Sequence, residues 1–241
     1  MTLLNIGDHL KNVLELSEAH CDKTINNGDI EFSQLYSYIE DLKKWLSIIG
    51  GQVENIEMFR SAFKEFEASC HLASFGYLRP SYFSLRFFLE HSLWALCLST
   101  SQIDYRNWVK GNLDFNWGFV QEHDRSVTSK AFAAAYLPEF EIESGTYREY
   151  SARMYRECSE FVHGNYKIYK EVHSEEDFDV KSLTRWKARA QLVFVVVTFF
   201  ISLRFLNSLN SDTIKENSHL VMDHLGHIEV VRLYMEGRNN G

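Results

Sequence analysis

The sequence predicts an all-α fold, and three observations support this prediction. Apolar residues recur at helical spacing along most of the 241 residues. Such spacing first appears at Leu3, Ile6, Leu10, Val13 and Leu14. The chain holds only two prolines, Pro80 and Pro138, and a proline inside a helix would break it. No sustained alternation of apolar and polar residues indicates a strand. We therefore expect a helical bundle.

The expected helices follow one another closely along the chain. We expect them at residues 3–16, 29–49, 53–73, 79–99, 146–163, 181–209 and 212–235, with short helices joined by loops over residues 104–138. Gly50 and Gly51 are suited to end the second helix. Pro80 falls in the first turn of its helix, where a missing N–H costs nothing. No internal repeat interrupts this succession.

The two glycines at residues 50–51 mark the only plausible domain boundary. They would separate an acidic N-terminal helical extension (residues 1–50) from a helical bundle (residues 51–241), although the two could also form one continuous domain. Residues 1–78 carry 12 acidic and 6 basic side chains, and residues 79–241 carry 21 and 19, which accounts for the net charge of −8. This distribution excludes a broad cationic surface for duplex DNA.

The cysteines and the most apolar stretch of the sequence indicate in which cellular compartment we expect the protein. The four cysteines are far apart and form no CxxC pair, and no signal-peptide pattern opens the sequence. We therefore expect reduced, mostly buried thiols in a cytoplasmic protein. The stretch AQLVFVVVTFFISL (residues 190–203) is shorter than the roughly 20 residues of a membrane span. It predicts a buried central helix, with no membrane as a partner.

The segment YRECSEFVHG (residues 155–164) contains the two residues of the chain that are best suited to catalysis. Arg156 and His163 are seven positions apart, so on a helix they share one face, about 10.5 Å apart along the axis. Gly164 is the residue type that ends a helix in the left-handed conformation. Histidine exchanges a proton near neutral pH, and arginine offers a planar fork of donors to phosphate oxygens. The pair suits acid–base chemistry on a phosphodiester without a metal or cofactor.

These residues resemble a known family. An R-x6-H pattern near a helix end, inside an all-α chain, is similar to the RX4-6H motif of HEPN domains (higher eukaryote and prokaryote nucleotide-binding). The prokaryotic form Y-x3-S-x3-HG is matched by Tyr155, Ser159, His163 and Gly164. Residues 84–111 resemble the earlier helix of such proteins and the W-x-x-G segment that follows it, with Arg86, Glu90, Trp108 and Gly111. The resemblance covers roughly residues 55–210.

The resemblance implies an endoribonuclease used in phage defence or as a toxin. Such domains pair across a two-fold axis, which brings two Arg–His motifs into one cleft. His163 would take the proton from an RNA 2′-OH, leaving a 2′,3′-cyclic phosphate, and Arg156 would stabilise the phosphorane oxygens. Proximity or a shared helix face makes Arg86, Arg153, Asn165 and Tyr166 further candidates for RNA contact. The implied partners are RNA, a second copy of the chain, and a defence-system or antitoxin protein.

Other interpretations remain open. The family often has Asn, Asp or His directly after the arginine, whereas this chain has Glu157, whose charge could repel phosphate. This favours the alternative of a catalytically silent HEPN-like module that binds RNA, a nucleotide or a partner protein; a helical scaffold of a defence complex is a third reading. Arg156 could also pair with Glu160, and Arg86 with Glu90, as i,i+4 ion pairs with no further function.

A metal site is the weakest alternative. His219, Asp223 and His227 lie four apart and would share one face of the last helix, but a single helix rarely supplies a complete metal site. A solvated helix face is the simpler interpretation, and we expect no metal. The aromatic residues at helical spacing predict core packing instead of a base-stacking surface; they are Phe59, Phe63, Phe66, Phe83, Phe87, Phe88 and Trp94.

Overall fold

The computed structural model describes residues 5–122, 124–163 and 179–240, and within these ranges it contains helices and no strands. The all-α prediction is therefore confirmed. The main helices are α1 (Ile6–Ile49), α2 (Ile56–Ser74), α3 (Leu78–Leu98), α7 (Glu141–His163) and α9 (Val180–Phe205). The shorter ones are α4 (Gln102–Val109), α5 (Trp117–Glu122), α6 (Lys130–Tyr136), α10 (Ser211–Glu216), α11 (His219–Leu225) and α12 (Glu229–Asn240), with 3-10 turns at Pro138–Phe140 and Leu206–Ser208.

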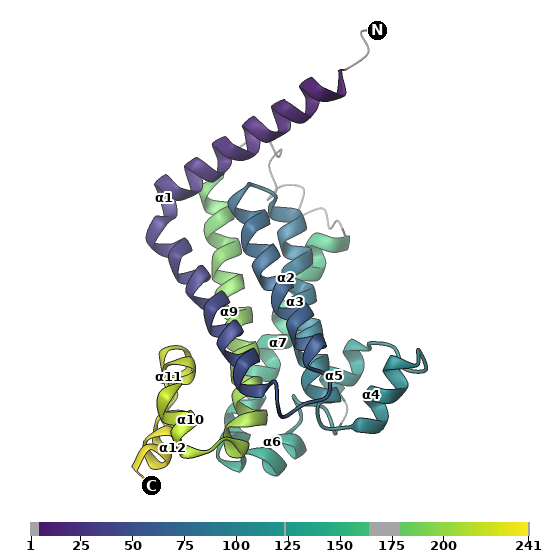
Figure 1. Ribbon diagram of the computed structural model, residues 1–241, viewed down its shortest axis with the longest axis vertical. Helices are drawn as coiled ribbons and strands as arrows, with labels where there is room; N and C mark the ends of the chain where they lie inside the picture. Colours follow the sequence, from purple (N-terminus) through teal and green to yellow (C-terminus); the bar gives the residue numbers. More distant parts are fainter. Residues whose placement is uncertain (1–4, 123, 164–178, 241) are drawn as a thin grey trace.

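Helices α2, α3, α7 and α9 pack side by side with the second half of α1 to form the bundle (Figure 1). Helix α9 is apolar on most sides because neighbouring helices surround it, and Phe194, Phe199 and Phe200 are fully buried. The segment Val180–Ser208 is long and apolar enough to cross a membrane, but 72% of its most apolar window is buried inside the bundle. The prediction of a buried central helix is confirmed.

Helix α1 is one continuous helix of 44 residues, so the predicted separation into two N-terminal helices is wrong. Asn5 caps its start by accepting a hydrogen bond from the backbone N–H of Gly7. No proline lies between the two apolar stripes, and a single glycine within a helix costs only about 1 kcal/mol. The helix therefore continues through the polar segment, where Figure 1 shows it changing direction.

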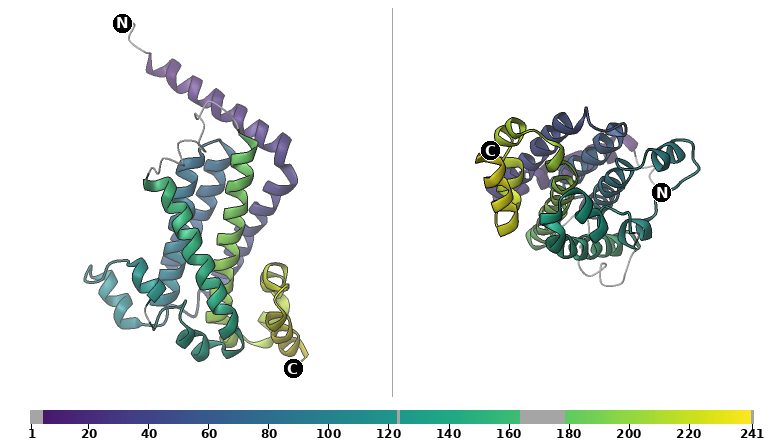
Figure 2. Two further views of the ribbon diagram at one scale, coloured as in Figure 1. Left: turned by 180° about the vertical axis from the view of Figure 1, so that it is seen from behind. Right: turned by 90° about the horizontal axis from the view of Figure 1, so that it is seen from below.

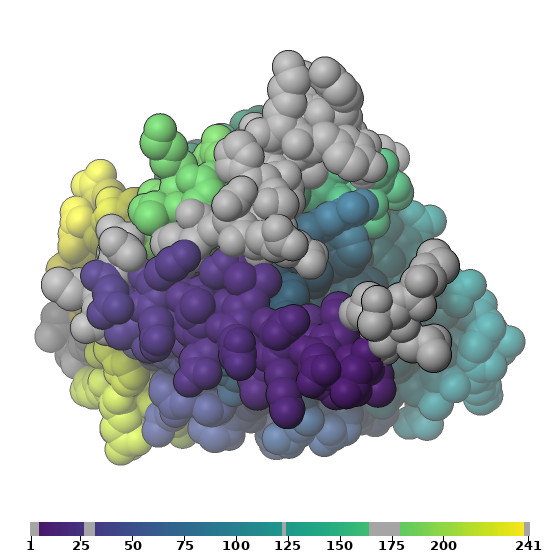
Figure 3. All heavy atoms as spheres, turned by 90° about the horizontal axis from the view of Figure 1, so that it is seen from above, coloured from purple at the N-terminus to yellow at the C-terminus, as the bar shows by residue number. Residues whose placement is uncertain are grey.

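The two halves of α1 have different environments. In the second half, Leu35, Leu42 and Trp45 are buried in the same core as α2 and α9. The first half projects beyond the bundle, where Ile6 and Leu14 are 68% and 67% exposed (Figures 1 and 2). Figure 3 looks down on this end and shows the first half of α1 lying across it. The division into domains at residues 50–51 stays a prediction.

The C-terminal region differs from the expected single helix over residues 212–235. It forms α10, α11 and α12, so that prediction is wrong. At the end of α11 the N–H of Gly226 bonds to the carbonyl of Met222. A Cβ atom at position 226 would lie 2.4 Å from that carbonyl oxygen, so the close turn requires glycine. As a result His219 and His227 do not share one helix.

Helix α7 places the YRECSEFVH segment at the end of the bundle. It follows the 3-10 turn at Pro138 and starts five residues earlier than expected, at Glu141. Its inner face buries Tyr147, Met154 and Phe161 against α3 and α9. His163 is the last residue of α7 that the structure describes. Gly164, Asn165 and Tyr166 lie outside the described residues.

Candidate functional site on helix α7

Arg156 and His163 lie on the outer face of α7. Met154, Cys158 and Phe161 are buried and define the inner face, and successive helical residues are about 100° apart, so Arg156 and His163 point away from the bundle. Both side chains are exposed. Neither forms a hydrogen bond or ion pair with another described residue, so the alternative pairing of Arg156 with Glu160 is not seen there. Both groups are accessible from solvent.

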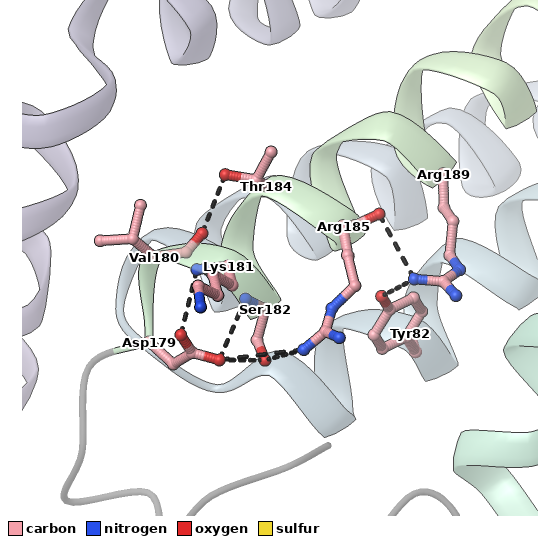
Figure 4. Close-up of polar contacts among 8 residues, drawn as sticks. All are labelled: Tyr82, Asp179, Val180, Lys181, Ser182, Thr184, Arg185 and Arg189. Atoms are coloured by element: carbon pink, nitrogen blue, oxygen red, sulfur yellow. Dashed lines mark hydrogen bonds and ion pairs between the residues drawn. The ribbon is translucent and has the colours of Figure 1, made fainter.

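Glu157, the residue that departs from the family pattern, faces α9. Its Oε2 atom accepts a hydrogen bond of 2.7 Å from Nε of Arg189, and its Oε1 atom lies 3.9 Å from Nε of Arg153. Arg189 also donates to the hydroxyl of Tyr82, at 3.1 Å (Figure 4). The positive charges of these two arginines offset the negative charge of the Glu157 carboxylate. This carboxylate lies on the flank of α7 and not on the face that carries Arg156.

Arg86 and Glu90 form the i,i+4 ion pair that was one of the two sequence interpretations. Nε of Arg86 donates to Oε1 of Glu90 at 2.9 Å, and its Nη2 donates to the Tyr155 hydroxyl at 2.8 Å. The two side chains are only 19% and 5% exposed. Burial raises the pKa of Glu90, and the charge and hydrogen bond of Arg86 oppose this rise. The ring of Trp117 stacks on Tyr155 at 4.1 Å and covers the cluster.

The remaining candidates for RNA contact have different placements. The Arg153 guanidinium lies 5.2 Å from the centre of the Tyr150 ring and beside Glu157, on the flank of α7, with its side chain 53% exposed. Arg86 points inward, toward Glu90. Asn165 and Tyr166 are not within the described residues. Among the candidates described, the structure therefore leaves Arg156 and His163 on the outer face and Arg153 beside it.

Three arginines that the sequence interpretation did not consider lie near the same end of the bundle. Nε of Arg79, at the start of α3, donates to the backbone carbonyl of Phe161 at 3.1 Å, in the last turn of α7. Arg185 and Arg189 lie one turn apart at the start of α9, where the Asp179 carboxylate caps the helix (Figure 4). The i,i+4 spacing of Arg185 and Arg189 could have indicated from the sequence that the two share a helix face. No sequence pattern could have indicated the contact of Arg79, because it joins residues 82 positions apart.

No protein-family model, curated protein or solved structure matches this chain. Cys158 is excluded as a nucleophile, since burial raises the pKa of its thiol to about 12. No group of three or more His, Cys, Asp or Glu residues that could hold a metal occurs in the described part of the chain. His219, Asp223 and His227 are exposed, and the turn at Gly226 separates His227 from α11.

Proposed function

We propose that the protein is a metal-independent, HEPN-like endoribonuclease that acts as a homodimer, in phage defence or as a toxin. The observation that carries the proposal is the outward placement of both Arg156 and His163 on α7, where neither side chain forms a hydrogen bond or ion pair with another described residue. An exposed guanidinium and an exposed imidazole on one helix face are available to a substrate and to a second subunit. The same face carries Ile142, two heptads before Arg156 and 87% exposed, and an apolar side chain there suits burial against a partner.

A homodimer would bring an arginine and a histidine closer together than they are within one chain. Within one chain the two residues are separated by about 10.5 Å along the helix, which is large for joint action on one phosphate. If two α7 helices cross antiparallel at a two-fold axis near Ser159, Arg156 of one copy meets the partner's His163. Ser159 is small and bonds to its own helix through the carbonyl of Tyr155, so it allows close approach. Each composite site would then hold one arginine and one histidine from different chains.

In such a groove the reaction needs only groups of this chain. One His163 imidazole takes the proton of the RNA 2′-OH, and the oxygen forms a bond to the adjacent phosphorus. The bond from phosphorus to the 5′-oxygen breaks, and that oxygen leaves with the proton that the same His163 returns. Arg156 donates hydrogen bonds to the phosphorane oxygens while charge develops on them. The products are a 2′,3′-cyclic phosphate and a 5′-hydroxyl end.

A catalytically silent module that binds RNA, a nucleotide or a partner protein is the second candidate. The observation that favours it is the engagement of neighbouring cations: Arg86 is paired with Glu90, and Arg153 and Arg189 with Glu157. Among the described residues, few unpaired positive charges then remain beside Arg156 to hold an RNA backbone. In this case Arg156 would contribute to binding, and His163→Ala would leave cellular RNA intact.

Cleavage by two site variants and two matched controls tests the proposal. His163→Ala and Arg156→Ala should each lower the rate of RNA cleavage by about 10²- to 10⁴-fold. His219→Ala and Arg148→Ala remove an exposed histidine from α11 and an exposed arginine from α7, and should cleave as the wild type does. The assay contains EDTA and scores the 2′,3′-cyclic phosphate end. Equal rates for wild type and His163→Ala would favour the binding module, and a loss of cleavage caused by EDTA would indicate a metal.

Mixing the two inactive variants tests the composite site directly. In a heterodimer of Arg156→Ala and His163→Ala chains, one groove keeps an intact arginine and an intact histidine from different chains. Cleavage should return on mixing, to about one quarter of the wild-type activity if chains exchange at random and each dimer has two equivalent grooves. If both variants are inactive alone and mixing restores nothing although the chains exchange, the residues act within one chain and the dimer arrangement is wrong.

A further inference from the structure

A cavity borders helix α3 at His91 and Trp94. It has a volume of about 130 Å³. Its lining comes from α2, α3, α4 and the chain before α5, and consists of Met58, Ser61, His91, Trp94, Trp108 and Phe115. Four of these six side chains carry flat rings. None of them belongs to the site on α7.

The chain after α3 turns back to build one wall of the cavity. Helix α4 is capped by Ser101 and ends in a turn where Gly111 has a φ of +71°, the left-handed conformation that glycine adopts without strain. This reversal returns Phe115 to α3, where its ring meets Trp94 edge-on at 5.9 Å and 88°. It also meets His91 edge-on, at 6.4 Å and 88°. The rings thus form walls at right angles, a shape that suits a flat occupant.

Two polar groups of the lining have no hydrogen-bond partner among the described residues, the His91 imidazole and the Ser61 hydroxyl. The Trp94 side chain is 2% exposed and its indole nitrogen is buried, so this ring contributes a wall and not a donor. The His91 ring stacks on Phe87 at 5.2 Å and makes no hydrogen bond with a described residue. Burial lowers the pKa of His91, although Glu65 opposes this, so the ring offers one donor and one acceptor at neutral pH. The Ser61 hydroxyl stands at the exposed rim.

We propose that this cavity binds a single-ring heteroaromatic compound with a hydrogen-bond acceptor, such as a pyrimidine base. An apolar pocket with a few convergent polar groups is typical of small-molecule sites. A cavity of about 150 Å³ holds benzene, so the volume fits one six-membered ring. Aromatic walls would also suit a quaternary ammonium ion, but such a cation offers neither a donor nor an acceptor to the His91 ring. The partly exposed Ser61 and Trp108 leave room for a substituent, so the ring could be a free base or part of a nucleoside.

This proposal does not depend on the proposed ribonuclease function, and the test uses binding alone. The chain has five tryptophans, hence five indole N–H signals in a ¹⁵N-correlated NMR spectrum, and Trp94→Phe identifies the one of interest. Titration of the full chain with uracil and with uridine should move the Trp94 signal selectively, with a Kd of about 1 mM or tighter. Equal affinities would indicate that the ring alone is recognised, whereas tighter uridine binding would indicate a nucleoside site.

Three variants locate the site. His91→Phe keeps a flat ring but removes the donor and the acceptor, and should weaken binding about five- to tenfold. Ser61→Phe fills the cavity from its exposed rim, so it should fold normally and abolish binding. His227→Phe is the matched control, because it replaces an exposed histidine that is not part of this lining, and should bind uracil as the wild type does.

Four results would overturn the proposal. The first is that neither uracil nor uridine binds the wild-type chain at about 5 mM. The second is that benzene binds as tightly as uracil and the Trp94 signal does not move, which would mean an apolar void. The third is that tetramethylammonium binds in preference to uracil, which would mean a cation site. The last is that Ser61→Phe, shown to be folded by its melting temperature, binds uracil unchanged.

Discussion

Arg86 and Arg156 invite comparison because each lies on a long helix and precedes an ionisable residue on the same face. Arg86 is followed at i+4 by Glu90, and Arg156 at i+7 by His163. Arg86 uses its donors inside the protein, on Glu90 and on the Tyr155 hydroxyl. Arg156 has no partner among the described residues and faces solvent. The same side chain thus stabilises the fold in one place and is free for a ligand in the other.

The surrounding residues, and not the arginines, produce this difference. On α3, Leu85, Phe88 and Leu89 are fully buried, and Arg86 sits at the edge of their face, under Tyr155 and Trp117. On α7, the buried residues lie on the face opposite Arg156. Helical spacing predicts which residues share a face, but the direction of that face depends on the apolar residues beside it.

The largest expected effect comes from breaking the Arg86–Glu90 pair. Arg86→Met should lower the free energy of unfolding by about 3 kcal/mol, because it leaves a buried carboxylate without its counter-charge. Chemical denaturation monitored by circular dichroism measures this loss. Arg148→Ala, an exposed arginine on α7, is the control and should change the free energy by less than about 0.5 kcal/mol.

The double variant Arg86→Met/Glu90→Leu separates charge from packing. An apolar pair of similar size avoids the unpaired charge, so most of the lost stability should return. If the double variant is as unstable as Arg86→Met alone, the loss arises from packing against Tyr155 and the buried-charge explanation is wrong.

A smaller effect is expected from pH. Burial raises the pKa of Glu90 above its ordinary value of 4.5, while Arg86 opposes the rise. A carboxyl with a raised pKa in the folded state favours folding below its ordinary pKa and loses this contribution as pH rises through the raised value. Arg86→Met removes the opposing influence and enlarges the rise. The destabilisation of Arg86→Met relative to wild type should therefore be smaller at about pH 5 than at about pH 8.

Denaturation curves of both proteins at the two pH values check this expectation. All other titrating groups are common to the two chains, so the difference between them isolates Glu90. A destabilisation that is equal at both pH values would mean that the Glu90 carboxyl does not change its protonation when Arg86 is removed.

The fold could be predicted where the helical pattern was strong and its ends were marked. Residues 53–73, 79–99 and 181–209 match α2, α3 and α9 closely, since apolar spacing and the turn at Pro80 defined them. The two errors have local causes. The polar segment between the stripes of α1 suggested a break, yet it contains no proline. Gly226 was accepted inside a helix, but the chain turns there because only glycine fits beside the Met222 carbonyl.

The candidate site could be predicted only as far as one helix determines it. The seven-residue spacing placed Arg156 and His163 on a common face, and both lie on the outer face of α7. The partners of Glu157 could not be found in this way, because Arg189 is 32 residues away on another helix. Similarly, the cavity at Trp94 depends on the reversal at Gly111, which helical spacing does not describe.

The smallest expected effect on stability is that of replacing Arg156. Arg156→Ala should change the free energy of unfolding by no more than about 0.5 kcal/mol, because the guanidinium contacts no described residue and alanine favours a helix. Thermal and chemical denaturation next to Arg86→Met measure the contrast. A stable Arg156→Ala chain that has lost cleavage would have lost a contact to RNA and not its fold. A loss above about 1 kcal/mol would mean that Arg156 supports the structure, and the distinction between the two arginines would then fail.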